Sequence, residues 1–207
     1  MSLAEAAALA VRLRSAVGDE RVLGAIAATP RERFVPPGER ERAYENVALP
    51  IACGQTISQP LVVARMLETL ELQPGDRVLD IGTGSGYHAA LLARLAGHVW
   101  TIERHPELSA AAQDAIASLD IGNVTFEIGD GYQGLPAQAP FDAINVAAAA
   151  GESVAETLER QLAPGGRLVV PIGESDQHLM LSRRTPDGIV RFKLEPVRFV
   201  PLVPGPG

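Results

Sequence analysis

Three glycines at alternate positions follow a short apolar run near the middle of the chain. The run contains Val78, Leu79 and Ile81, and the glycines are Gly82, Gly84 and Gly86. Glycine has no Cβ and tolerates positive φ, so a turn of this composition lets the backbone approach a ligand closely. The residues after the turn have an amphipathic pattern that predicts a helix. We therefore expect a buried strand, a ligand-binding turn and a helix in succession.

The spacing of these glycines narrows the class of ligand. Nicotinamide and flavin proteins favour the pattern G-x-G-x-x-G, in which a helix N-terminus faces a pyrophosphate. Here the glycines alternate, and Asp80 lies on the strand just before the turn. A carboxylate at that place would repel a diphosphate, but it suits a ligand that carries an amino group and a positively charged sulfur. The ligand that we infer is S-adenosylmethionine.

Carboxylates follow three of the expected strands. Asp80 closes the first strand, Glu103 closes the second, and Asp130 follows the third. The position of Glu103 suits a carboxylate that accepts hydrogen bonds from both hydroxyls of a ribose, and Asp130 could accept one from the amino group of adenine. Each carboxylate alone would equally suit a helix N-cap or a solvated strand end, but the three together favour a cofactor site. The residues expected at the cofactor are Asp80, Gly82, Thr83, Gly84, Ser85, Gly86, Glu103, Gly129, Asp130 and Gly131.

Strands and helices alternate through the centre of the chain. This alternation predicts an α/β fold with a Rossmann-like, doubly wound, mostly parallel sheet and helices on both faces. Two extended runs around a Pro186-Asp187-Gly188 turn then predict a C-terminal antiparallel hairpin. The expected strands are 77–81, 98–103, 124–128, 141–147 and 167–172, the helices are 86–96, 106–119 and 153–162, and the hairpin runs are 178–184 and 189–199.

The N-terminal part of the chain predicts a helical extension of the same domain. Residues 2–28 have helical periodicity, and the charged stretch 31–46 is interpreted as a mostly solvated loop. Ser58 followed by Gln59-Pro60 suits a helix start with Ser58 as N-cap. We expect one domain over 1–207, made of an extension at 1–60, a cofactor-binding core at 77–172 and the hairpin at 178–203.

Composition limits the other possible functions. The chain has 207 residues and a net charge of −7, which argues against a nucleic-acid surface because such a surface needs concentrated positive charge. The single cysteine, Cys53, excludes an internal disulfide and a cysteine-rich zinc site. The four histidines lack a tight metal-ligand spacing, so no metal is expected. No signal peptide or membrane span is evident, and we expect a soluble, cytoplasmic monomer.

The segment LPIACGQTISQP, residues 49–60, carries a family resemblance together with several other motifs. The chain resembles the protein-L-isoaspartate O-methyltransferase family over about residues 20–203. The G-Q-T-I-S-Q-P part is specific to that family, whereas the glycine turn is shared by the wider methyltransferase superfamily. The other motifs are PRERFVP, AYEN, IGTGSGY, GDGYQGLP, APFDAI, LAPGGRLVVPIG and FVPLV.

The resemblance implies an enzyme that repairs age-damaged proteins. The family uses S-adenosylmethionine to methylate the free α-carboxylate of L-isoaspartyl residues, and often the side chain of D-aspartyl residues. By this resemblance Ser58 is the active-site hydroxyl and Val200-Pro201-Leu202 closes over the peptide. The residues expected at the substrate are Gln55, Thr56, Ile57, Ser58, Ala147, Val200 and Leu202.

Two further residues and one alanine run near these motifs each have more than one interpretation. Cys53 stands where many family members have histidine, and it is interpreted first as a small buried residue and second as a pocket residue. His88 is interpreted as a helix-start residue near the cofactor rather than a proton carrier. The Ala147–Ala150 run could allow close approach of substrate backbone, or could equally form a tightly packed turn.

The implied chemistry needs no strong general base. A carboxylate has a reference pKa near ~4, so the nucleophile is already ionised at neutral pH. The electrophile is a methyl group on a positively charged sulfur, and the enzyme must align two oppositely charged reactants and partly desolvate them. Ser58 has no evident base partner, so we expect it to orient the carboxylate and not to act as a nucleophile.

Three alternatives remain open. The same scaffold could act on the aspartate of a dedicated peptide or on a small carboxylic acid. It could bind the cofactor without catalysis, although the intact sequence from Gln55 to Ser58 weighs against this. A nicotinamide dehydrogenase is the most distant alternative because the glycine spacing is wrong for it.

Overall fold

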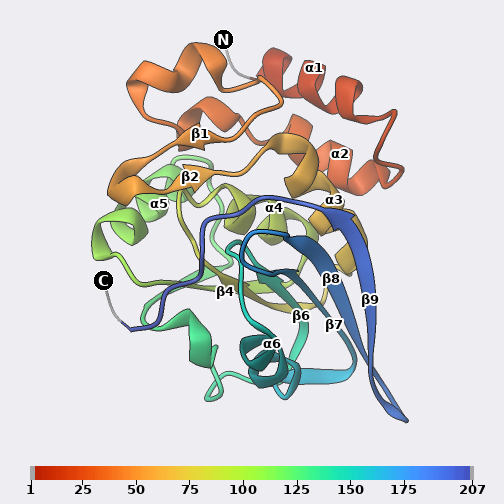
Figure 1. Cartoon of the computed structure of the whole chain (residues 1–207). Helices are drawn as coiled ribbons and strands as arrows, with labels where there is room; N and C mark the ends of the chain where they lie inside the picture. Colours follow the sequence, from red (N-terminus) through yellow and green to blue (C-terminus); the bar gives the residue numbers. More distant parts are fainter. Residues whose placement is uncertain (1–2, 206–207) are drawn as a thin grey trace.

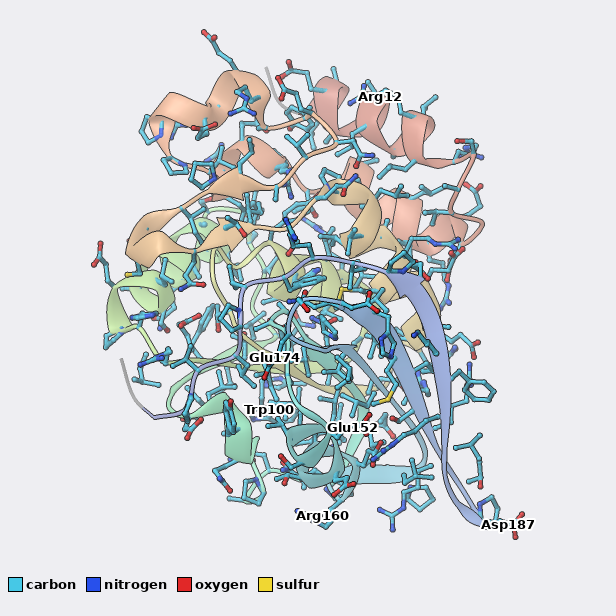
Figure 2. The ribbon with its side chains drawn as sticks, in the orientation of Figure 1. Arg12, Trp100, Glu152, Arg160, Glu174 and Asp187 are labelled. Carbon is cyan, nitrogen blue, oxygen red and sulfur yellow. The ribbon has the colours of Figure 1, made fainter. Side chains whose placement is uncertain are left out.

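A mostly parallel sheet forms the centre of the computed structural model, which describes residues 3–205 (Figure 1). Within that range the sheet has seven strands in the order β5-β4-β3-β6-β7-β8-β9. Neighbouring strands from β5 to β7 pair in parallel, whereas β8 and β9 pair antiparallel at one edge. The bounds are β3 Arg77–Ile81, β4 His98–Glu103, β5 Val124–Ile128, β6 Phe141–Val146, β7 Leu162–Ile172, β8 His178–Thr185 and β9 Gly188–Pro196. The expected fold class and C-terminal hairpin are confirmed, and Figure 2 shows Asp187 at the tip of that hairpin.

Helices cover both faces of the sheet. Helices α2, α3, α4 and α5 lie on one face, α1 packs against α2, and α6 covers the other face. None of the helices formed by residues 3–205 has both the length and the apolar character needed to cross a bilayer. The helices are α1 Leu3–Leu13, α2 Glu20–Ala27, α3 Pro60–Leu70, α4 Tyr87–Leu95, α5 Pro106–Ala117 and α6 Glu152–Glu159.

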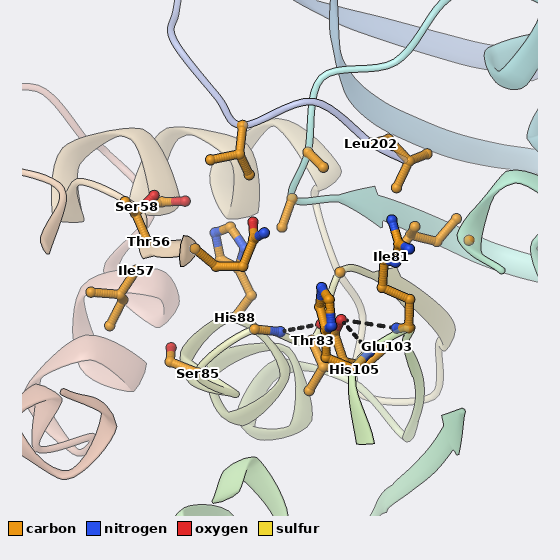
Figure 3. A pocket seen from close by; sticks show the side chains of 18 of the residues that line it. Thr56, Ile57, Ser58, Ile81, Thr83, Ser85, His88, Glu103, His105 and Leu202 are labelled. Carbon is orange, nitrogen blue, oxygen red and sulfur yellow. Dashed lines mark hydrogen bonds between the residues drawn. The ribbon is translucent and has the colours of Figure 1, made fainter. Parts of the chain in front are cut away.

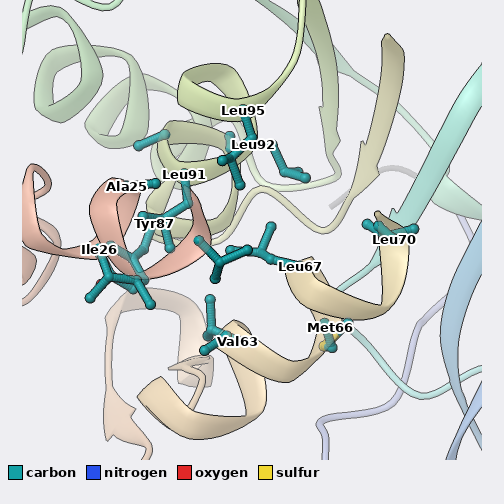
Figure 4. Packing of buried hydrophobic residues seen from close by; sticks show 14 of the residues in the cluster. Ala25, Ile26, Val63, Met66, Leu67, Leu70, Tyr87, Leu91, Leu92 and Leu95 are labelled. Atoms are coloured by element: carbon teal, nitrogen blue, oxygen red, sulfur yellow. The ribbon is translucent and has the colours of Figure 1, made fainter. Parts of the chain in front are cut away.

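Two apolar clusters hold the helices to the sheet. Val78 belongs to the cluster formed with α2, α3 and α4, whereas Leu79 and Ile81 belong to the cluster formed with α6. Successive side chains of a strand point to opposite faces, so β3 is buried on both sides. Figure 4 shows part of the first cluster, to which α3 contributes Leu67 and α4 contributes Leu91.

The observed elements differ from the expected ones mainly around β7. This strand begins at Leu162 instead of 167, because Leu162 already pairs with Phe141 of β6. The helix expected over 153–162 therefore ends at Glu159. The helical stretch expected at 2–28 contains α1 and α2, and the expected positions 1–2 and 206–207 of the domain lie outside the described residues.

The segment that carries the family resemblance forms a small hairpin. β1 (Leu49–Pro50) and β2 (Thr56–Ile57) pair antiparallel, and a short 3-10 turn over Ala52–Gly54 joins them. Cys53 lies in this turn with a φ of 55° and is exposed, so its interpretation as a buried residue was wrong. The reason is its place at the tip of the hairpin, which turns its side chain away from the core.

Helix α3 is not capped by Ser58, contrary to the expectation. The helix begins at Pro60, and its N-cap residue is Gln59, which makes no side-chain capping bond. A cap at Ser58 would need the N–H of residue 60 or 61. Pro60 has no N–H, and the N–H of Leu61 donates to Oδ1 of Asn46 at 3.0 Å. Because Asn46 supplies the cap, the Ser58 hydroxyl does not serve as one.

The charged stretch 31–46 is not simply a solvated loop. It contains two 3-10 helices, Arg31–Phe34 and Pro37–Arg42, and Arg31 is fully buried. The guanidinium of Arg31 donates to the carbonyl of Ala43 at 2.9 Å and to that of Ser58 at 2.8 Å. Arg31 thus ties the stretch 31–46 to the end of the segment 49–60, within the N-terminal extension.

Gly86 tests how closely α4 and α5 pack. Its φ is +85°, and a Cβ added there would lie 2.9 Å from the Cβ of Ala112 on α5. Backbone strain and overpacking act together, so we expect Gly86→Ala to lower the free energy of unfolding by about 2–4 kcal/mol. Urea denaturation followed by circular dichroism measures this change.

Gly24→Ala is the matched control. Gly24 lies inside α2, and an added Cβ would meet nothing within 4 Å. Alanine is the better helix former, so this variant should gain about 0.5–1 kcal/mol. Equal effects of the two substitutions would contradict the packing assigned to Gly86.

Candidate active site

A cavity opens at the carboxyl ends of β3 and β6, where the strand order reverses (Figure 3). After β3 the chain continues outward to β4 and β5, and then returns to β6 on the other side of β3. Ligands of doubly wound sheets bind at such a switch point. The space at this cavity amounts to about 830 Å³ when the open solvent at its mouth is included. Its walls come from the β1–β2 hairpin, the loops after β3, β4 and β6, and the segment 200–203.

Glu103 forms part of one wall, and three backbone N–H groups fix its carboxylate. Oε2 accepts from Gly84 at 2.9 Å, while Oε1 accepts from Arg104 at 2.8 Å and from His105 at 3.0 Å. The side chain is 6% exposed. Each carboxylate oxygen can accept about two hydrogen bonds. Oε2 therefore keeps an acceptor position that a ligand hydroxyl can use.

A buried row of polar side chains lies under the cavity. Asp80 of β3 stands in register with Thr101 of β4 and Asn145 of β6. Its carboxylate accepts from Oγ1 of Thr101 at 2.9 Å and from Nδ2 of Asn145 at 2.8 Å. Burial raises the pKa of Asp80 to about 6, although both hydrogen bonds oppose the increase. At neutral pH the carboxylate of Asp80 is therefore largely ionised, and it lies beneath the floor of the cavity.

The structure brings most of the expected site residues together. Of those expected, Gln55, Thr56, Ile57, Ser58, Gly82, Thr83, Gly84, Ser85, Glu103, Gly131, Ala147, Val200 and Leu202 line the cavity. Asp80, Gly86, Gly129 and Asp130 lie outside its lining. Asp80 points into the interface between the sheet and α4. Its carboxylate accepts from Asn145 there and does not face the cavity. Gly86 packs α4 against α5, and the N–H of Gly129 donates to the carbonyl of Glu103 at 3.0 Å.

Asp130 lies next to the lining and caps a short 3-10 helix, Gly131–Gln133. Its Oδ1 accepts from the N–H of Tyr132 at 2.9 Å. This is the capping role that the sequence left open beside a contact to adenine. The neighbouring Gly131 does line the cavity, and a Cβ there would lie 2.6 Å from Cγ2 of Ile81. The adenine contact of Asp130 stays a prediction.

Ser58 lies where the cavity meets a second groove. Thr56, Ser58, Ala147 and Val200 line both, and the groove continues along residues 196–199. Figure 3 shows Ser58 and Leu202 on opposite sides of the cavity. A small ligand in the cavity and a longer chain in the groove would therefore meet beside Ser58.

The C-terminal segment is held in place by the loop after β6. The carbonyl of Val200 accepts from the N–H of Ala149 at 2.8 Å, and the N–H of Leu202 donates to the carbonyl of Ala149 at 2.7 Å. The hydroxyl of Tyr132 also donates to the carbonyl of Leu202 at 3.2 Å. These bonds hold residues 200–202 in place, where they form one wall of the cavity.

Some residues that line the cavity are not among the expected cofactor or substrate residues. Tyr87 and His88 form the first turn of α4 and are 2% and 6% exposed. Burial lowers the pKa of His88 to about 4, so its imidazole is neutral at pH 7. The sequence indicates His88 as a helix-start residue near the cofactor, whereas the only signal for Tyr87 is its place directly after the third glycine. The other lining residues outside the expected set are Val63, Ile81, Ile102, Arg104, His105 and Val203, whereas Ala148 and Pro201 belong to segments that the sequence already indicates.

The residues present fit S-adenosylmethionine. Glu103 offers a free acceptor position for a ribose hydroxyl, and the buried Asp80 supplies negative charge that favours an ammonium and a sulfonium nearby. Nε2 of His88 is buried and has no hydrogen-bond partner among residues 3–205. Within the same range, no group of three or more His, Cys, Asp or Glu side chains is placed to hold a metal ion.

Comparison with known proteins gives a consistent result. The family model described as protein-L-isoaspartate(D-aspartate) O-methyltransferase matches residues 5–206. A protein-L-isoaspartate O-methyltransferase from Erwinia tasmaniensis is 50% identical over 189 residues, which cover 91% of this chain and 90% of that protein.

Two solved structures with the same fold are also described as protein-L-isoaspartate O-methyltransferases. A protein-L-isoaspartate O-methyltransferase superposes with a TM-score of 0.83 at 31% identity, over 93% of this chain and 64% of that one, so this chain spans just under two thirds of its length. One from Plasmodium falciparum, in complex with S-adenosyl-L-homocysteine, has a TM-score of 0.84 at 28% identity. That match covers 96% of this chain and 98% of the other.

The raised pKa of Asp80 makes stability depend on pH. An aspartate in the unfolded chain titrates near 3.8, against about 6 in the fold, so the folded state binds its proton more tightly. Ionisation of Asp80 therefore costs stability as pH rises through this interval. Asp80→Asn cannot ionise, and we expect its free energy of unfolding, relative to the parent protein, to rise by about 2–3 kcal/mol between pH 4 and pH 8. Urea denaturation of the ligand-free proteins measures the difference.

Asp187→Asn serves as the control because Asp187 is exposed at the hairpin tip. Its stability relative to the parent should change little over the same pH range. A flat difference for Asp80→Asn as well would mean that the buried carboxylate is not destabilised by its surroundings.

Proposed function

This chain belongs to the protein-L-isoaspartate(D-aspartate) O-methyltransferase family, and we infer that it methylates the free α-carboxylate of L-isoaspartyl residues in damaged peptides and proteins. The methyl donor is S-adenosylmethionine. The observation that carries this proposal is the match over residues 5–206, with the segment from Gln55 to Ser58 lining the cavity. The bound S-adenosyl-L-homocysteine of the Plasmodium falciparum relative supports the choice of cofactor.

The reaction depends on alignment more than on proton transfer. The isoaspartyl carboxylate is ionised at neutral pH, so it attacks without a general base. The cofactor supplies a methyl group on a positively charged sulfur. Correct orientation and partial desolvation of such reactants are worth up to about 7–11 kcal/mol. In the proposal Ser58 donates a hydrogen bond to one carboxylate oxygen, which leaves the other oxygen free to attack.

The proposed cofactor contacts follow the geometry of the cavity. Glu103 accepts a hydrogen bond from the ribose of S-adenosylmethionine through Oε2. The loop from Gly82 to Ser85 packs against the amino-acid end of the same cofactor. Asp130 is assigned to the amino group of adenine. Asp80 acts through its charge from beneath the floor, because its oxygens already accept from Thr101 and Asn145.

The proposed peptide site is the groove that meets the cavity at Ser58. Thr56, Ala147 and Val200 line both spaces, so a peptide in the groove would bring its damaged residue to the methyl donor. The methyl ester has a better leaving group than the free acid. The neighbouring backbone nitrogen then attacks the ester carbonyl, methanol leaves, and the succinimide hydrolyses partly to normal aspartate without further enzyme.

Several finer features stay part of this proposal. The family description supports acceptance of D-aspartyl residues. The single free cysteine fits a cytoplasmic protein, and the net charge of −7 fits one that does not bind nucleic acid. We propose a monomer, which sedimentation would test.

A methyl-transfer assay tests the proposed activity. Two peptides that differ only in one L-isoaspartyl or L-aspartyl residue are incubated with labelled S-adenosylmethionine. We expect transfer to the isoaspartyl peptide alone, because only that isomer presents a free α-carboxylate attached directly to Cα, whereas the aspartyl carboxylate lies one methylene away from the chain. Intact cofactor binding with no transfer to either peptide would contradict the proposal and point to a dedicated partner peptide.

Ser58→Ala tests the role of the hydroxyl. We expect cofactor affinity to stay within about threefold, while methyl transfer falls roughly 10- to 100-fold because a charge-assisted hydrogen bond is lost. Calorimetry and steady-state kinetics measure the two quantities. Ser118→Ala, at the exposed end of α5, removes a hydroxyl that bonds only the carbonyl of Ala115, and it should leave both unchanged. Full activity of Ser58→Ala would remove Ser58 from the mechanism.

A further inference from the structure

His88 presents a buried, unpaired polar atom at the active-site cavity. It is the second residue of α4, it is 6% exposed, and it lines the cavity. Figure 3 shows its side chain between the side of the cavity formed by Ser58 and the side formed by Thr83. Nε2 makes no hydrogen bond within the described part of the chain. A buried polar atom without a partner costs about 1–3 kcal/mol, so its retention calls for an explanation.

The neighbours of His88 decide which ring nitrogen carries the hydrogen. Nδ1 lies 3.4 Å from Nδ2 of Asn145, and that same nitrogen donates to Asp80 at 2.8 Å. An amide nitrogen has two hydrogens and no acceptor capacity, so Nδ1 must be the acceptor. The neutral imidazole then carries its hydrogen on Nε2. The unpaired atom at the cavity is therefore an N–H donor.

The surroundings of this donor favour an anionic acceptor. Arg31 is fully buried, its charge lowers the pKa of His88, and no ion pair joins it to a carboxylate within residues 3–205. The positive end of α4 begins at Tyr87, beside His88. On the other side of Asn145, Asp80 supplies negative charge. A carboxylate in the cavity would thus find an unpaired N–H donor and the N-terminal end of α4 together on the His88 side.

We propose that the Nε2–H of His88 is a hydrogen-bond donor for a carboxylate bound in the active-site cavity. This inference rests on the proposed function, whose reactants bring two carboxylates: that of the methionine end of S-adenosylmethionine and that of the isoaspartyl residue. Asn145 is a positioning residue, because it holds the ring so that the hydrogen lies on Nε2. His88 itself transfers no proton and stays neutral.

NMR of protein labelled with ¹⁵N at histidine tests the contact directly. The Nε2–H signal of His88 is assigned by its loss in His88→Gln. We expect it to move downfield when S-adenosyl-L-homocysteine binds and to stay in place with adenosine, which lacks the amino-acid end. A shift only after an isoaspartyl peptide joins the complex would assign the donor to the substrate carboxylate. No shift with either ligand, while calorimetry shows both bound, would overturn the proposal.

Variants supply a second readout. His88→Phe keeps an aromatic ring and removes the donor, and should weaken binding of the responding ligand roughly 10- to 100-fold. His88→Gln keeps an N–H group and should restore affinity to within about threefold. Equal weakening in both variants would mean a structural role and would overturn the proposal.

His98→Gln is the matched control for these measurements. His98 lies at the opposite end of β4 from Glu103, where it bonds Thr125 and packs on Trp100, so its replacement should leave both affinities unchanged. Failure of the proposed function would look different from failure of this inference. In that case the unmodified protein would transfer no methyl group to the isoaspartyl peptide, whereas the inference alone fails when transfer occurs, the ligands bind and His88 does not respond.

Discussion

The register of β3 against its two neighbours is the constraint on which the site depends. It sets Asp80, Thr101 and Asn145 in one row on the sheet face under α4, so a buried carboxylate receives two hydrogen-bond donors. A slip of one residue would turn the carboxylate toward the apolar cluster packed by α6, where no such donors lie. The same register ends the strands together, which brings the glycine loop and Glu103 to one cavity.

Several buried polar atoms near the site have no hydrogen-bond partner, and the apolar core offsets the free energy that they cost. Nε2 of His88, Oδ1 of Asn145 and Nη1 of Arg31 are buried without partners among residues 3–205. Each such atom costs about 1–3 kcal/mol, and apolar packing of α2, α3 and α4 on the sheet offsets the cost. Of these three residues only His88 lines the cavity, so a ligand that pairs its Nε2 would recover part of that cost as affinity. Stability and ligand binding would therefore be coupled through His88.

Segments far apart in the sequence form the groove beside Ser58. β1 and β2 have two residues each, too short to be stable alone, and they are held by burial of Leu49 and Ile57 and by the bond from Arg31 to the carbonyl of Ser58. The segment around Val200 is fixed by its bonds to Ala149. These walls are thus positioned by contacts between residues far apart in the sequence.

The sequence by itself determined the succession of strands and helices along the central part of the chain, the glycine turn and the strand-end carboxylates, because these features follow local periodicity and local backbone requirements. Only the tertiary structure decided which polar groups line the cavity. Asp80 looked like a ligand contact but bonds its register partners, and Ser58 looked like a cap until Asn46 proved to supply it. Cys53 lies outside the core and Arg31 inside it. Exposure and hydrogen-bond partners depend on which distant segments pack together, and a pattern along the chain carries no record of those pairings.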